Sequence, residues 1–233
     1  MENFYKFNNM FGRRNKTFMW LGIDSEELYD KHFANPKKRK ILQELGWTKG
    51  NITYIFNSEG YRSPEFEKNG IVCFGCSNTL GVGVNYEQTW PYLLGKSLNL
   101  PVCNFGVGGS STDTAFRLAN YWIAELQPKY VFYLRPERSR REYVHIDNPI
   151  HIEDMSVWRS DSKYFLLTHD YADIIHDQKN SIGIEHICNE NNVKYYDIPR
   201  WDIKDFRKEA RDLEHSGPPF WEFVQNLFLE KME

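Results

Sequence analysis

Short apolar runs alternate with amphipathic stretches along the last two thirds of the chain. The runs have the length and composition of strands buried on both faces of a sheet, and the stretches between them repeat apolar residues at helical spacing. This pattern predicts strands at 71–74, 102–105, 130–134 and 193–198, helices at 87–98, 112–126 and 219–231, and helical segments within 164–191. Strands that alternate with helices form a parallel sheet covered on both faces. We therefore expect an α/β fold, a three-layer α/β/α sandwich around a central, mostly parallel sheet.

The first 50 residues do not share this pattern. Their hydrophobicity is irregular, and they contain the basic run Lys37-Lys38-Arg39-Lys40, which fits either a solvated helix face or a contact with an acidic surface. The β-rich run 51–56 ends in a turn-forming segment and predicts a strand that leads into the core. We therefore expect an N-terminal extension over 1–50 and one folded domain over 51–233. Within that domain, the polar section 138–162 has no clear pattern.

Composition and charge limit the class of protein. A chain of 233 residues fits one domain with a substantial core, and 41% hydrophobic against 26% charged residues is a globular balance. The net charge of -3 argues against a general affinity for nucleic acid. No run approaches the roughly 18 apolar residues of a membrane helix, and no apolar segment follows a basic start as in a signal peptide. We expect no membrane partner, and a location in the cytoplasm or within a larger assembly.

The chain has four cysteines, which are too few and too embedded in apolar runs for a disulfide scaffold. Cys73 and Cys76 are spaced like a redox pair or half of a zinc site. No second pair of cysteines or histidines follows at metal-ligand spacing. We therefore expect reduced, buried thiols and no metal site.

A serine follows the first strand of the predicted sheet, in the loop Gly75-Cys76-Ser77-Asn78-Thr79-Leu80-Gly81. Ligands of open parallel sheets bind beyond the carboxyl ends of the strands. A serine in a glycine-flanked turn at this edge can present both its Oγ and its backbone N–H to a ligand. Serine beside glycine is also common in ordinary turns, so this loop by itself is compatible with both interpretations.

Two further loops carry candidate chemistry. The glycines of loop 104–112 let a backbone amide approach an anion, although a structural loop with a Ser or Thr helix cap is equally compatible. No Gly-Lys-Ser/Thr follows, which argues against a nucleotide-binding P-loop. The second loop is Asp212-Leu213-Glu214-His215, just before the final helix. In a compact turn the Asp212 carboxylate can hold His215 through Nδ1 and leave Nε2 free to accept a proton from a serine. Taken alone, this segment is equally compatible with a surface turn.

Taken together, these loops resemble the SGNH hydrolase family of GDSL-like esterases and lipases, over about the last two thirds of the chain. The resemblance implies a flavodoxin-like α/β/α fold. It also implies Ser77 as the nucleophile, Asp212 and His215 as its charge partners, and the amides of Ser77 and Gly109 as oxyanion-hole donors. Cys76 stands where the family has Asp, a side chain outside the reaction.

One block departs from the family pattern. The family has Gly-x-Asn-Asp after the strand that ends near Leu134, with the Asn as an oxyanion donor, whereas this chain has Arg135-Pro136-Glu137-Arg138. We expect Arg135 to replace that donor, because a guanidinium offers a fixed fork of N–H groups. Arg138 and Asn78 are candidate substrate-binding residues. The alternative is that the arginines of this region pair with nearby glutamates in a solvated turn.

The resemblance implies a serine esterase that removes a small acyl group, acetyl in the simplest case, from a carbohydrate or another small-molecule ester, with no metal and no cofactor. Trp90, Trp122 and Trp221 either stack on a sugar or belong to the core, since each lies at helical spacing. The missing Asn leaves a non-catalytic binding or structural module as an alternative. An acyltransferase that uses the same acyl-enzyme is a third.

Overall fold

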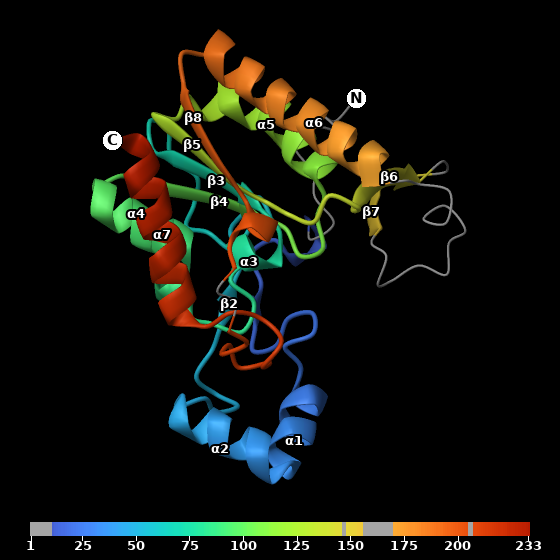
Figure 1. Ribbon diagram of the computed structural model, residues 1–233, viewed down its shortest axis with the longest axis vertical. Coiled ribbons are helices and arrows are strands. Elements are labelled where there is room, and N and C mark those ends of the chain that lie inside the picture. The colour runs from blue at the N-terminus through green and yellow to red at the C-terminus, as the bar shows by residue number, and fades with distance from the viewer. Residues whose placement is uncertain (1–10, 146–147, 156–169, 205–206) are drawn as a thin grey trace.

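The computed structural model describes residues 11–145, 148–155, 170–204 and 207–233. Its centre is a four-stranded parallel sheet with the strand order β4-β3-β5-β8 (Figure 1). The strands are β3 (Ile71–Gly75), β4 (Val102–Gly106), β5 (Tyr130–Arg135) and β8 (Lys194–Pro199). Every residue of β3 is buried, as expected for a strand with a neighbour on each side and helices on both faces.

Two layers of helices cover the sheet and complete the predicted sandwich (Figure 1). One layer is formed by α5 (Thr112–Leu126) with α6 (Asp170–Glu190), and the other by α4 (Trp90–Leu98) with α7 (Pro218–Met232). The predicted bounds of α5 are those observed, since the Ser111 hydroxyl caps its first turn. Helix α4 begins three residues later than predicted, because the 3-10 turn η3 (Tyr86–Gln88) precedes it.

The tryptophans and cysteines belong to the core. Trp90, Trp122 and Trp221 are at most 7% exposed, which confirms the core interpretation over sugar stacking. All four cysteines are buried and free, as predicted. Burial raises the pKa of Cys188 to about 12 and keeps that thiol protonated.

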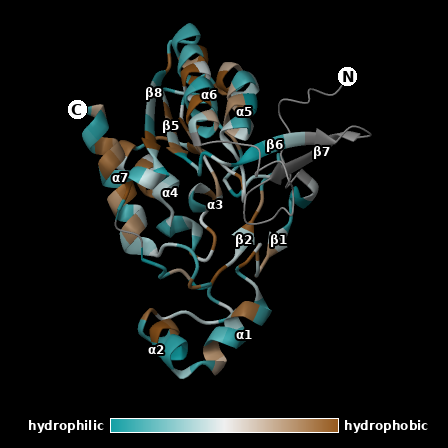
Figure 2. Cartoon of the chain, turned by 45° about the vertical axis from the view of Figure 1, so that its right-hand side comes forward, coloured by the Kyte–Doolittle hydropathy of each residue, from teal (hydrophilic) through white to brown (hydrophobic). Residues whose placement is uncertain are grey.

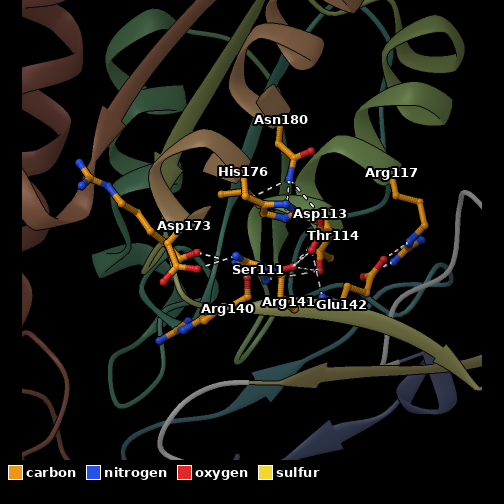
Figure 3. A network of polar contacts seen from close by, with 12 residues as sticks. Ser111, Asp113, Thr114, Arg117, Arg140, Arg141, Glu142, Asp173, His176 and Asn180 are labelled. Carbon is orange, nitrogen blue, oxygen red and sulfur yellow. Dashed lines mark hydrogen bonds and ion pairs between the residues drawn. The ribbon is translucent and has the colours of Figure 1, made fainter. Parts of the chain in front are cut away.

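The section that had no clear sequence pattern contains an antiparallel hairpin of β6 (Arg141–His145) and β7 (Asn148–Met155). A polar network joins the start of this hairpin to α5 and α6 (Figure 3). Its ion pairs are Arg117–Glu142 and Arg141–Asp173, both at 2.6 Å, and His176 Nε2 lies 2.7 Å from Asp113 Oδ1. Charge pairing, rather than an alternation of apolar residues, holds the described start of the hairpin to the sandwich, which explains why the sequence pattern was weak there.

The N-terminal segment contains η2 (Phe11–Arg13), β1 (Thr17–Phe18), α1 (Glu26–Ala34) and α2 (Pro36–Glu44). Helices α1 and α2 form a small lobe at the lower end of the molecule as drawn in Figure 1. Strand β1 pairs with β2 (Tyr54–Ile55), which is shorter than the predicted strand 51–56. The basic run 37–40 lies on the largely exposed helix α2, as expected for a solvated helix face.

The helices mix polar and apolar residues along their length (Figure 2). Even α6, with 21 residues, carries charged side chains from its first turn to its last. Within the described ranges, no helix combines the length and apolar character needed to cross a membrane.

Candidate active site

Ser77 occupies a tight turn at the carboxyl end of β3. Gly75 has φ 155°, and a Cβ at this position would lie 2.0 Å from Thr79 Oγ1, so the turn requires glycine. The chain then enters the short helix α3 (Ser77–Leu80), whose first residue is the serine. This turn places Ser77 at the edge of the sheet where ligands of parallel sheets bind.

His215 joins this serine to a buried carboxylate. Its Nε2 lies 3.0 Å from Ser77 Oγ, across 138 residues of sequence, and its Nδ1 lies 2.6 Å from Asp212 Oδ2. The distance between Ser77 and His215 falls in the range expected for proton transfer from a serine to a base. The structure therefore brings together the three residues that the sequence predicted as a triad.

The ionisation of Asp212 fixes the direction of these hydrogen bonds. Burial raises the pKa of Asp212, but the hydrogen bond with His215 Nδ1 outweighs it, together with the N–H groups of Glu214 and His215, which donate to Oδ1 at 2.9 Å. The net pKa lies below the usual value, so the carboxylate is charged at neutral pH and only accepts hydrogen bonds. His215 Nδ1 then donates to Asp212, and Nε2 is left to accept the Ser77 proton.

The glycine loop after β4 is bound to the serine turn. A Cβ at Gly106 would lie 2.1 Å from the backbone nitrogen of Leu80, so this glycine permits close contact between β4 and α3. Gly109 has φ 84°, in the left-handed region that favours glycine. The next residue, Ser110, donates its hydroxyl to the carbonyl of Gly75 at 3.1 Å. The loop that carries Gly109 is thus fixed against the end of β3.

Asn104 is a supporting residue that the sequence analysis did not identify. It is 1% exposed, its Nδ2 donates to the carbonyl of Thr79 at 3.0 Å, and its Oδ1 accepts from the N–H of Gly106 at 2.9 Å. It therefore links the serine turn to the glycine loop. The sequence did contain a signal for this supporting role: a polar amide lies in the middle of a predicted buried strand, and a buried amide needs hydrogen-bond partners.

Arg135 lies elsewhere than predicted. Its Nη1 forms an ion pair with Asp177 at 2.9 Å and its Nε with Asp197 at 2.8 Å, so its guanidinium is engaged by α6 and β8. The Arg138 guanidinium stacks on Trp201 at 4.2 Å. Neither arginine lines the cavity around Ser77. The structure gives no support to the predicted oxyanion role of Arg135, because two carboxylates hold its charge away from the serine.

A cavity of about 680 Å³ opens beside Ser77. It is lined by Ile23, Cys76, Ser77, Asn78, Pro136, Glu137, Arg140, Arg200, Lys208, Glu214 and His215. Lys208 and Glu214 form an ion pair at 2.6 Å, which leaves the arginines in excess over Glu137. Asn78, a predicted substrate-binding residue, lies in this wall with a buried Oδ1 that has no hydrogen-bond partner among the described residues. The cavity therefore presents a nucleophile, a base and a modest excess of positive charge.

A metal centre is not evident in the part of the chain that the structure describes. No group of three or more His, Cys, Asp or Glu side chains there has the arrangement needed to hold a metal ion. What the described residues of the cavity offer is a hydroxyl hydrogen-bonded to an imidazole, which is the arrangement of acyl transfer through a serine.

No family model and no curated protein matches the sequence. Among solved structures, the chain is similar to a protein from Desulfitobacterium hafniense DCB-2 described as lipolytic and of the G-D-S-L family. The identity is 14% and the TM-score 0.37, over 68% of this chain and 97% of the other. It is also similar to the psychrotrophic esterase EstA from Pseudoalteromonas sp., solved with monoethylphosphonate as inhibitor, at 12% identity and a TM-score of 0.37, over 71% and 98% of the two chains.

Proposed function

We propose that the protein is a serine esterase with Ser77 as nucleophile, His215 as general base and Asp212 as the carboxylate that orients the base. The observation that carries this proposal is the unbroken chain of hydrogen bonds from Ser77 Oγ through His215 to Asp212, at 3.0 and 2.6 Å. A hydroxyl is a weak nucleophile at neutral pH and gains reactivity from such an adjacent, oriented base. An ordinary surface turn has no need to bury an ionised carboxylate, whereas Asp212 is only 1% exposed.

The reaction follows from these contacts. Ser77 Oγ attacks the ester carbonyl carbon while its proton passes to His215 Nε2, and the carbonyl π electrons move onto the oxygen. When the tetrahedral intermediate collapses, the alcohol leaves with the proton from Nε2 and an acyl-serine remains. Water, deprotonated by His215, then attacks the acyl-serine. When this second tetrahedral intermediate collapses, the bond to Ser77 Oγ breaks, Nε2 returns the proton to Ser77 Oγ, and the carboxylic acid is released. Throughout, the charge of Asp212 stabilises the imidazolium.

For the oxyanion, we propose the backbone N–H groups of Ser77 and Gly109 as donors. The first N–H groups of a helix have no partner within it, and Ser77 begins α3. Arg135 is left out of this assignment because Asp177 and Asp197 bind its guanidinium. One missing donor costs about 10²- to 10³-fold in rate, so a hole of two amides supports slow but real turnover.

The cavity also supports a substrate class. Arg140 and Arg200 lie in its wall, and guanidinium groups bind carboxylate and phosphate oxygens with paired hydrogen bonds. Arg140 takes the part that the sequence analysis gave to Arg138. The proposed substrate is an acetyl or other small acyl ester of an alcohol that carries a carboxylate or phosphate, an acidic carbohydrate being the favoured case.

A fluorophosphonate probe tests the proposal at the level of atoms. Such probes phosphonylate only an activated serine, so intact mass should show one adduct on the wild-type protein and none on Ser77→Ala. Peptide mapping should then locate the adduct on Ser77. A wild-type protein that stays unlabelled, or a Ser77→Ala protein that is still labelled, would remove Ser77 as the nucleophile and favour a non-catalytic module.

A further inference from the structure

The residue before the catalytic aspartate is a fully buried arginine. Arg211 is 0% exposed, and its Nε and Nη2 bind the two carboxylate oxygens of Asp24 at 3.0 and 2.6 Å. Asp24 is itself 1% exposed and lies 187 residues away in the N-terminal segment. A bidentate pair this deeply buried is costly to desolvate and persists only when its geometry and further hydrogen bonds are favourable.

The same segment supplies the remaining partners of this guanidinium. Nη1 donates to the carbonyl of Lys49 at 3.0 Å, and Nη2 donates to the carbonyl of Met19 at 2.6 Å. The Cζ atom of Arg211 lies over the Trp20 ring, 3.9 Å from its centroid. Arg211 thus binds four oxygens of the segment 19–49, a number and geometry that a lysine ammonium cannot match.

The network continues from Asp24 to the loop that follows the serine helix. The Tyr54 hydroxyl donates to Asp24 Oδ2 and accepts the N–H of Gly83 at 2.8 Å. The carbonyl of Gly83 in turn accepts the N–H of Arg211 at 2.8 Å. A Cβ at Gly83 would lie 3.3 Å from Asp212 Oδ1, so this glycine also lets the loop pass close to the catalytic carboxylate.

The turn that this network holds is conformationally strained. Leu213, between Asp212 and His215, has φ 49°, a left-handed conformation that a branched side chain rarely adopts. The N–H of Ala210 donates to the carbonyl of His215 at 3.1 Å and closes the turn. Such a backbone persists only where its surroundings hold it, and Arg211, two residues before Leu213, is held by the N-terminal segment.

We propose that the segment 19–49 is a positioning element of the active site, which acts through the Arg211–Asp24 pair to hold the turn that orients Asp212 toward His215. The inference rests on the proposed function, since it assigns a part in the same triad. Ile23, the neighbour of Asp24, lines the cavity beside Ser77, so the segment also contributes directly to the substrate site. Asp24 and Arg211 are positioning residues, because neither reaches the reacting atoms.

A second buried ion pair elsewhere in the chain provides a control that distinguishes a positioning role from a loss of stability. Arg117 and Glu142 form a bidentate ion pair at 2.6 and 2.8 Å, with side chains that are 6% and 5% exposed (Figure 3). This pair joins α5 to β6 and makes no contact with the Asp212–His215 turn among the described interactions. Arg117→Met therefore removes a buried guanidinium of the same kind without touching the base.

The test compares Arg211→Met, Asp24→Asn and Arg117→Met by thermal melting, by the downfield proton resonance of His215 Nδ1–H, and by turnover of a neutral acetyl ester. His215→Gln identifies the resonance by removing it. Arg211→Met and Arg117→Met should both lower Tm. Arg211→Met and Asp24→Asn, but not Arg117→Met, should shift or abolish the resonance and reduce kcat by about 10- to 100-fold with little change in KM, since small misplacements of catalytic groups have effects of this size.

Further variants keep the result decisive. Arg211→Lys should recover part of kcat, and the effects of Asp24→Asn and Arg211→Met should be less than additive because each breaks the same pair. If Arg211→Met does not fold, Asp24→Asn supplies the same readouts with an unchanged side-chain shape. An unaltered resonance and kcat in a folded Arg211→Met or Asp24→Asn protein would overturn the inference. If the wild-type protein fails to react with fluorophosphonate, the esterase proposal falls, while the resonance still tests the positioning.

Discussion

Replacing Asp212 with asparagine tests the hydrogen-bond direction on which the proposed catalysis depends. In Asp212→Asn the side-chain oxygen can keep the two backbone N–H groups that Oδ1 now accepts at 2.9 Å. The amide nitrogen then faces His215 Nδ1 at the position of Oδ2, where the present distance is 2.6 Å. Because an amide nitrogen only donates, Nδ1 must become an acceptor and the ring proton must move to Nε2.

That change of tautomer removes the base. A protonated Nε2 cannot take the proton of Ser77, so we expect kcat to fall by about 10⁴-fold, the size of loss that the wrong tautomer produces in such triads. The assay is acetate release from an acetyl ester at pH 7, with intact mass to measure the acyl-enzyme. Since the backbone hydrogen bonds survive, the protein should remain folded.

Asp177→Asn is the matched control. Asp177 is also buried, and it pairs with Arg135 rather than with the triad, so its replacement should leave acetate release within about twofold of the wild-type rate. A loss of less than about tenfold in Asp212→Asn, or an equal loss in Asp177→Asn, would show that the proposed tautomer control is incorrect.

Three further predictions concern the substrate, the turn and pH. Arg140→Gln should lower the preference for an anionic over a neutral acetyl ester by about tenfold, the value of one charge-assisted hydrogen bond, whereas Arg138→Gln should leave that preference unchanged. The ratio of the kcat/KM values for the two esters measures the preference. The reverse result would assign the substrate contact to Arg138. Gly75→Ala should abolish fluorophosphonate labelling, because its Cβ would lie 2.0 Å from Thr79 Oγ1; retained labelling would show that the turn can relax. The pKa of Asp212 is lower in the folded protein than in the unfolded chain, so this group stabilises the fold at pH values above its unfolded pKa of about 3.9. That stabilisation is lost as the pH falls through the folded pKa. The Tm of the wild type should therefore exceed that of Asp212→Asn by less at pH 3 than at pH 6.

The succession of strands and helices along the chain could be predicted from the sequence, because the pattern that indicates each element lies within that element. Helix α5 was predicted with its observed bounds, since the periodicity of its apolar residues and the Ser111 cap lie within one segment. The Asp212–His215 contact was also predictable, because a turn brings residues three apart together. Ser77 could be proposed as their partner only through the resemblance of three loops to one family.

Other features depend on contacts between distant segments and could not be read from the sequence. Arg135 was expected at the oxyanion, yet α6 and β8 place Asp177 and Asp197 against it. Strands β6 and β7 had no recognisable alternation, because ion pairs rather than a buried face anchor the described start of that hairpin.

The N-terminal segment shows most clearly the difference between local patterns, which the sequence reveals, and contacts between distant segments, which it does not. Its irregular hydrophobicity suggested an extension without an evident role, since periodicity detects elements that bury one of their own faces. The Arg211–Asp24 pair spans 187 residues and leaves no local trace in either stretch of sequence. The sequence by itself determined the layered sandwich, which follows from local patterns, and it pointed to Ser77, Asp212 and His215 as a proposed triad through the resemblance of three loops to one family. The tertiary structure decided which charges meet, because a buried ion pair depends on where folding brings its two partners.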